Sequence, residues 1–330
     1  MNGNANEYVI EKDPKYNVPT EELLKKFPII YQTPAPTDLA KKVQNRMLNG
    51  FNTWNMGYDA WEHWGEVLYH KDSLYNVHGV HFTLEEYQKS MNVALAATDI
   101  QMGDFQNMIF SDDWTAIRYE TVNIDRKTGE RTPADVTEFV RFKDFGELGA
   151  KVEEGWGGVK CETFNGMSHF QTEEERATQR AFLEELIATK LKDTDDLEEK
   201  YPVVFPTSLD PKYGKEMRDI ILKDFDNWNK GYEQYESWID EFLTVDCEFD
   251  LKRNKLSVQE LKEATKKEIS KFSPIRVRIN NILTSDDWLA VHYWEVVSCD
   301  DGKKDVFNHM NFYHFIETVD GLKVDKAWCR

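Results

Sequence analysis

The sequence predicts an α+β fold that is present twice in the chain. The segment Phe51–Trp64 (FNTWNMGYDAWEHW) returns as Phe225–Trp238 (FDNWNKGYEQYESW), 174 positions later, with half of its positions identical. This period is far longer than the roughly 20–50 residues of a solenoid repeat, so it indicates two whole domains. Within each copy, a helical period of apolar residues precedes an alternating one, and helices followed by antiparallel strands indicate the α+β class. We expect two domains, 1–165 and 166–330.

Three helices are expected near the start of the first copy. Apolar residues at spacings of three and four form one stripe and predict a helix over 38–55. Gly57 suits the left-handed conformation that ends such a helix, and a second helix is expected over 58–68. Thr83 and Glu86 have the spacing of a capping box, which predicts the start of a third helix. The same box returns 174 positions later in the second copy.

Strands are predicted on both sides of the third helix. The segment 75–81 has the length of a strand, and after the helix the apolar period drops to two. Four further strands are expected in the first copy, over 106–110, 114–123, 136–143 and 150–156. Residues 157–200 join the two copies, and they include a charged helix that ends near Lys192.

The composition argues against several classes of partner. A net charge of −19 disfavours nucleic acid, because neutralisation of phosphates supplies much of the affinity for it, and it also disfavours anionic membranes. The residues 1–16 have no basic region followed by an apolar stretch, so we expect no secretory signal. No run approaches the roughly 18 apolar residues of a membrane span. The histidines and cysteines match no short chelating motif. We therefore expect a cytoplasmic protein without a metal ion or another cofactor.

Four motifs give the chain a family resemblance. They are WNMGY from Trp54, YNVHG from Tyr75, EFVRF from Glu138 and KVEEGW from Lys151. With the order of the elements, they make the chain similar to the nuclear-transport-factor-2-like superfamily, which includes SnoaL-like polyketide cyclases and ketosteroid isomerases. The resemblance covers both copies. It implies two tandem cone-shaped domains, each with N-terminal helices packed in a curved, mostly antiparallel sheet around an apolar pocket. It also implies an intramolecular pseudo-dimer, alone or within a homo-oligomer.

Two residues of the first copy are the candidate catalytic residues. The resemblance places His78 where ketosteroid isomerases hold their general base, and Glu138 where they hold a neutral acid that donates to the oxyanion. An imidazole suits proton transfer at neutral pH, and Glu138 interrupts an apolar stripe, so burial would raise its pKa. The alternatives are an exposed His78 and a Glu138 that faces outward or pairs with Arg118. In the second copy we align these two residues with Lys252 and Asn308.

Six further residues are expected to bind the substrate. Three of them recur in the second copy, so the alternative for these is packing, and for the rest it is a solvated or interface face. They are Trp54, Tyr58, His70, Arg118, Glu120 and Trp156. The tyrosine donor of the isomerases is missing, because Gly50 stands near its position.

The sequence thus predicts a small-molecule acid–base enzyme of SnoaL-like type. It would act as an isomerase, cyclase or dehydratase on a hydrophobic cyclic or carbonyl-bearing substrate. The histidines at 70, 78 and 81 have no counterparts in the second copy. We therefore expect the active pocket in the first domain and a degenerate second domain. Two alternatives stay open. One is a non-catalytic small-molecule binding or carrier protein of the same fold, and the other is a structural domain pair.

Overall fold

The computed structural model describes residues 17–77, 79–160, 172–210, 212–251, 253–298 and 302–329. The chain forms two compact units, Met1–Arg180 and Ala181–Arg330, which we call unit 1 and unit 2. They divide within helix α6 (Glu173–Ala188). The boundary predicted between residues 165 and 166 lies in 161–171, outside the described residues.

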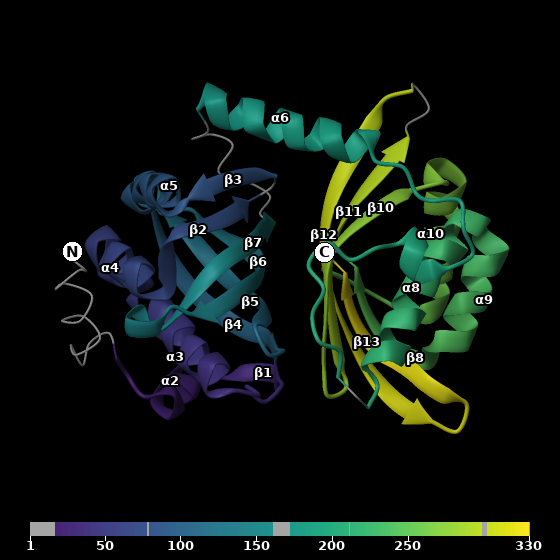
Figure 1. The fold of residues 1–330 in the computed structure, drawn as a ribbon, viewed down its shortest axis with the longest axis horizontal. Coiled ribbons are helices and arrows are strands. Elements are labelled where there is room, and N and C mark those ends of the chain that lie inside the picture. The colour runs from purple at the N-terminus through teal and green to yellow at the C-terminus, as the bar shows by residue number, and fades with distance from the viewer. Residues whose placement is uncertain are drawn as a thin grey trace. The chain divides into compact units, whose positions relative to one another are not determined.

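Unit 1 combines helices with one mixed sheet, as expected of the α+β class. The sheet has the order β1-β4-β5-β6-β7-β2-β3, and its neighbours are antiparallel except for the parallel pairs β1–β4 and β2–β7. Figure 1 shows α3, α4 and α5 together on one face of this sheet. The helices are α2 (Thr20–Lys26), α3 (Asp38–Thr53), α4 (Tyr58–Leu68) and α5 (Leu84–Ala97), with the 3-10 turns η1 (Trp54–Met56) and η2 (Gly146–Leu148). The strands are β1 (Ile29–Gln32), β2 (Tyr69–Val77), β3 (Val80–Thr83), β4 (Thr98–Phe110), β5 (Trp114–Asp125), β6 (Arg131–Asp144) and β7 (Ala150–Lys160).

The predicted starts of the second and third helices are confirmed. The first helix, predicted over 38–55, ends at Thr53, and Gly57 combines its positive φ with a ψ of 170°, which is not the left-handed helical conformation. Gly57 has a φ of 101° between η1 and α4, a conformation that a residue with a Cβ rarely adopts. Thr83 and Glu86 form the complete capping box of α5. The strand predicted over 75–81 is wrong in extent. Its described residues belong to a hairpin of β2 and β3, in which the Asn76 side chain accepts a hydrogen bond from Gly79 N at 3.0 Å.

Unit 2 repeats this architecture. Helices α8, α9 and α10 again lie on one face of a sheet, with the order β10-β11-β12-β13-β8-β9 (Figure 1). Its helices are α7 (Leu197–Lys200), α8 (Gly214–Lys230), α9 (Tyr232–Phe242) and α10 (Val258–Phe272). Its strands are β8 (Leu243–Leu251), β9 (Asn254–Leu256), β10 (Arg276–Ser285), β11 (Trp288–Ser298), β12 (Lys304–Thr318) and β13 (Gly321–Cys329). The bounds of α9 and β8 lie 174 positions after those of α4 and β2. The two-copy α+β prediction is confirmed.

Strand pairing corrects one equivalence between the copies. Glu138 lies opposite Ile117, and the counterpart of Ile117 in unit 2, Val291, lies opposite Asn311. The counterpart of Glu138 is therefore Asn311 and not Asn308. The alternation of apolar residues does not by itself fix how a strand is aligned with its neighbour. A shift of the pairing register by an odd number of residues moves every side chain to the other face of the sheet. Asn308 and Asn311 differ by three positions, so they lie on opposite faces.

Candidate functional site

Unit 1 contains an apolar cavity of about 100 Å³ between α5 and the sheet. Most of its lining is aromatic, aliphatic or glycine, and one carboxyl group, that of Glu138, borders it. The lining residues are Trp54, Tyr75, Val77, Tyr87, Met91, Ala94, Thr98, Ile100, Tyr119, Thr121, Asn123, Val136, Glu138, Gly157 and Gly158. Small-molecule sites have this composition, an apolar wall with few polar groups.

Two tyrosine hydroxyls donate hydrogen bonds to the Glu138 carboxyl. The Tyr119 hydroxyl donates to Glu138 Oε1 at 2.9 Å, and the Tyr75 hydroxyl is a second donor. Burial in apolar surroundings raises the pKa of Glu138 to about 7, and the two tyrosine hydroxyls partly oppose this rise by favouring the carboxylate. Near neutral pH the carboxyl therefore exists both as an acid and as a base. This is the state that general acid–base catalysis requires.

Glycines on β7 make room for Tyr75. A Cβ added at Gly155 would lie 2.2 Å from the Tyr75 ring, and one at Gly157 would lie 2.8 Å from its hydroxyl oxygen. Gly157 is also the β7 partner of Glu138, so the missing side chain lets the phenol reach the carboxyl. Sequence reasoning missed Tyr75 and Tyr119 as site residues. The signal was present, because glycine inside a strand often marks a close approach of another group.

The predicted site residues are only partly brought together. Glu138 and Trp54 both line the cavity. His78 lies outside the described residues, although its neighbour Val77 is part of the lining. Arg118 and Glu120 are not among the lining residues. Tyr119 and Thr121 line the cavity, and successive side chains on a strand point to opposite faces.

Arg118 has partners on its own face of the sheet. Its guanidinium is buried and donates to Asn107 Oδ1 at 3.2 Å and to Gln106 Oε1 at 3.4 Å. The alternative, a pair of Arg118 with Glu138, is therefore wrong. Arg118 lies directly opposite Thr137, one position before Glu138.

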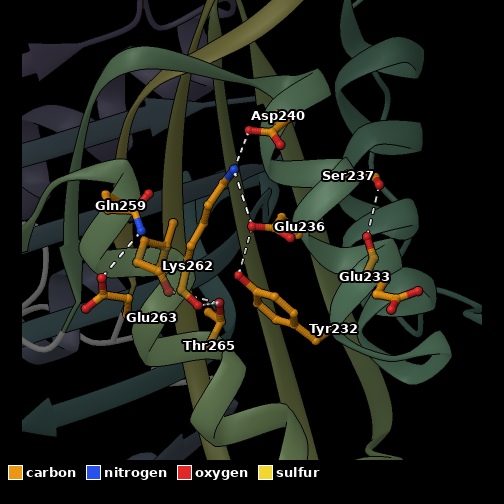
Figure 2. Close-up of polar contacts among 10 residues, drawn as sticks. Tyr232, Glu233, Glu236, Ser237, Asp240, Gln259, Lys262, Glu263 and Thr265 are labelled. Atoms are coloured by element: carbon orange, nitrogen blue, oxygen red, sulfur yellow. Dashed lines mark hydrogen bonds and ion pairs between the residues drawn. The ribbon is translucent and has the colours of Figure 1, made fainter.

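Tyr58 has a structural contact that recurs in unit 2. Its hydroxyl donates to Glu62 Oε1 at 2.9 Å, and the equivalent Tyr232 donates to Glu236 Oε1 at 3.0 Å. Figure 2 shows this pair in unit 2, where Lys262 extends it to Asp240 at 2.6 Å. A contact that is present in both units belongs to the shared architecture, and Tyr58 is not among the lining residues.

His70 and Trp156 also lie outside the lining. The His70 ring stacks on Phe145 with centroids 4.1 Å apart. Trp156 donates through its indole nitrogen to Glu154 Oε1 at 3.2 Å. It lies opposite Phe139 and is adjacent in β7 to Gly157, so it faces away from the cavity.

Over the part of the chain that the structure describes, no three His, Cys, Asp or Glu side chains are grouped so that they could bind a metal ion. Two of the four cysteines, Cys247 and Cys329, are buried thiols. The other two, Cys161 and Cys299, lie outside the described residues. The described helices also include none with the length and apolar character that crossing a membrane requires.

Several solved structures are similar to part of this chain. A SnoaL-like polyketide cyclase from Agrobacterium tumefaciens has 16% identity and a TM-score of 0.29, over 34% of this chain and 89% of its own. A nuclear transport factor 2-like superfamily protein from Salmonella enterica has 11% identity and a TM-score of 0.30, over 35% and 88%. A ketosteroid isomerase-like protein from Erwinia carotovora has 14% identity and a TM-score of 0.29, over 36% and 92%. No protein-family model and no curated protein matches the chain.

Proposed function

We propose that unit 1 is an acid–base enzyme that transfers a proton on a small, hydrophobic, carbonyl-bearing molecule. Glu138 is the group that takes and returns the proton. The observation that carries the proposal is the position of this carboxyl in an apolar cavity, with two tyrosine donors and a pKa of about 7. Isomerisation, intramolecular cyclisation and dehydration each need such a group, because each moves a proton next to a carbonyl or a hydroxyl.

The size of the cavity limits the substrate. A dry engineered cavity of about 150 Å³ holds benzene, and the unit 1 cavity measures about 100 Å³. The cavity therefore suits a short chain or part of a single ring, and a larger molecule extends past the lining. His78 remains the proposed second proton-transfer group, next to Val77 in the lining.

Exchange of carbon-bound hydrogen tests the proposal without knowledge of the natural substrate. Cyclopentanone is incubated with the full chain in heavy water, and deuteration next to the carbonyl is followed by NMR. The C–H bond breaks, the proton goes to the Glu138 carboxylate, and a solvent-derived deuteron returns to the carbon. We expect Glu138→Gln to slow the catalysed exchange by about 10²–10⁴-fold.

The matched control is Glu120→Gln, which removes the same charge from a neighbouring strand but from a residue outside the lining. It should leave the exchange unchanged. Equal exchange with the native protein and with Glu138→Gln would overturn the proposal. Saturable binding of cyclopentanone without any catalysed exchange would also overturn it, in favour of a non-catalytic binding or carrier protein.

A further inference from the structure

Unit 2 contains a pocket of about 200 Å³ that is lined from α7, α8, β10 and the segment 202–209. None of its lining residues corresponds to a lining residue of the unit 1 cavity. Most of the lining is apolar and consists of Pro202, Val203, Pro206, Leu209 and Ile282. The polar lining residues are Glu198, Thr207 and Arg218. In an apolar pocket the few polar groups decide which ligand is bound.

Arg218 brings an incompletely paired guanidinium into this pocket. Its side chain is 19% exposed, and its Nε is buried without a hydrogen-bond acceptor among the residues that the structure describes. Its Nη2 lies 4.0 Å from Glu198 Oε1, which is beyond hydrogen-bond distance. Because a poorly hydrated donor without an acceptor costs free energy, a ligand that brings an acceptor to this guanidinium would be stabilised.

The other two polar groups of the pocket leave the guanidinium available. The Thr207 hydroxyl donates its proton to the Ile282 carbonyl oxygen. The Glu198 side chain is 54% exposed, so water weakens its long ion pair with Arg218. A ligand anion at hydrogen-bond distance from the guanidinium would replace this loose contact with a charge-assisted hydrogen bond, which is stronger.

The shared fold does not require an arginine at this position. The parallel pairing of β1 with β4 recurs in unit 2 as a single bridge at the same 174-residue offset, so the offset holds around the pocket. It places Gln44 at the position of Arg218 and Leu24 at that of Glu198. Gln44 is buried, and its Nε2 lies 3.8 Å from Met108 Sδ. Unit 1 thus has neutral side chains at these positions, whereas unit 2 places a cation there.

We propose that the unit 2 pocket binds a small monocarboxylate that carries an apolar group. The planar guanidinium of Arg218 matches a carboxylate through two parallel N–H···O hydrogen bonds, and the prolines and aliphatic side chains contact the apolar group. A cavity of about 150 Å³ holds benzene, so a pocket of about 200 Å³ has room for one ring and its carboxylate. Glu198 disfavours a doubly charged anion, because one cation cannot offset both carboxylate and ligand charges. This site is independent of the function proposed for unit 1.

Benzoate is the probe, with benzamide and inorganic phosphate as comparisons. The full chain is titrated with each compound by calorimetry, and the Nε–H signal of Arg218 is followed by proton–nitrogen NMR. We expect benzoate to bind saturably at millimolar concentration or below and to shift this signal. Benzamide has the ring without the charge, and phosphate has charge without a ring, so each should bind at least about tenfold more weakly. This comparison uses the unaltered protein, so it remains decisive even if a variant fails to fold.

Two variants of the pocket should change the affinity for benzoate in opposite directions. Arg218→Gln, which installs the unit 1 residue, should weaken benzoate by about tenfold or more, because the charge-assisted hydrogen bonds are lost. Glu198→Gln removes the competing carboxylate and should strengthen benzoate by about two- to fivefold. The matched control is Arg126→Gln, which makes the same change of charge at an exposed arginine of unit 1 that pairs with Asp99. It should leave the affinity unchanged.

The titrations also distinguish this site from a purely structural arginine. An Arg218 that only supported the fold would lower the unfolding temperature when replaced and leave the benzoate affinity as it was. Absence of a saturable shift of the Arg218 signal with benzoate, equal affinity for benzamide or phosphate, unchanged affinity in Arg218→Gln, or weaker binding in Glu198→Gln would each overturn the proposal.

Discussion

At the scale of single residues, the most consequential feature is where each unit places a carboxyl whose pKa is raised to about 7. In unit 1 it is Glu138 on the sheet, and the helix position equivalent to Asp224 is Gly50. In unit 2 it is Asp224 on the helix, and the sheet position holds Asn311. Burial raises the pKa of both carboxyls to about 7. The two units thus differ in which element presents the acid with this raised pKa.

The raised pKa of Glu138 makes the stability of unit 1 depend on pH. Its pKa rises from 4.5 in its ordinary state to about 7 in the fold. The stabilisation by the folded-state proton is therefore complete below about pH 4.5 and is lost as the pH rises through 7. Glu138→Gln stays neutral, so its unfolding free energy relative to the native protein should increase by about 3 kcal/mol between those limits. Urea unfolding near pH 5 and near pH 8 measures this.

Tyr119→Phe is a control that raises the pKa of Glu138, whereas Glu138→Gln removes the titrating group. It removes a hydrogen bond that lowers the pKa of Glu138, so the loss of stability should move to higher pH. If the difference between Glu138→Gln and the native protein were the same at both pH values, the carboxyl would not be desolvated as described.

At the scale of elements, β7 shows how one strand shapes the site. A Cβ at Gly157 on β7 would meet the hydroxyl of Tyr75 on β2. In unit 2 strand register places Cys329 at the position of Gly157, and the counterpart of Tyr75 is Phe249. A phenylalanine has no hydroxyl to accommodate, so the unit 2 strand tolerates side chains where unit 1 requires glycine. The glycine pattern of β7 thus follows from the phenol that reaches Glu138.

A double-mutant cycle tests this coupling. A Cβ at residue 157 would meet the Tyr75 hydroxyl oxygen at 2.8 Å, so Gly157→Ala should lower the unfolding free energy by about 1–3 kcal/mol through overpacking. Tyr75→Phe, which installs the unit 2 residue, should remove most of that cost. Chemical denaturation of the four proteins gives the coupling energy. Additive effects would show that the hydroxyl is not the group in contact.

The two capping boxes allow a matched comparison between the units. Thr83 with Glu86 and Ser257 with Glu260 make the same reciprocal hydrogen bonds at the starts of α5 and α10. Thr83→Ala and Ser257→Ala should each cost about 1 kcal/mol of unfolding free energy. Thr83→Ser keeps the hydroxyl and should cost little. Stability measurements that found only one of the two boxes important would contradict their equivalence.

At the scale of the whole molecule, the chain has two separate hydrophobic cores. The unit 1 core contains Leu48 and the unit 2 core contains Leu222, which occupy equivalent positions on α3 and α8 and are both 0% exposed. Each unit therefore has its own source of stability, even though the two share one chain. The pseudo-dimer and the homo-oligomer stay predictions.

Leu48→Ala and Leu222→Ala are a matched pair for this separation. Each should cost about 2–5 kcal/mol, because each leaves a cavity in a packed core. We expect Leu48→Ala to weaken amide-exchange protection in unit 1 and to leave unit 2 protected, and the reverse for Leu222→Ala. Equal loss of protection in both units from either variant would mean that the chain unfolds as one cooperative body.

The sequence by itself determined the duplication, the α+β class, the bounds of α4 and the start of α5, because these depend on local periodicity and on capping side chains. It also singled out Glu138, since a carboxylate in an apolar stripe is conspicuous. Only the tertiary structure decided which residues surround it. Strand register identified Asn311 as its counterpart, placed Tyr119 beside Glu138, and turned Arg118 and Glu120 to the other face. Such facts depend on which strands pair and in what register, and a period of two in one strand carries no information about its neighbour.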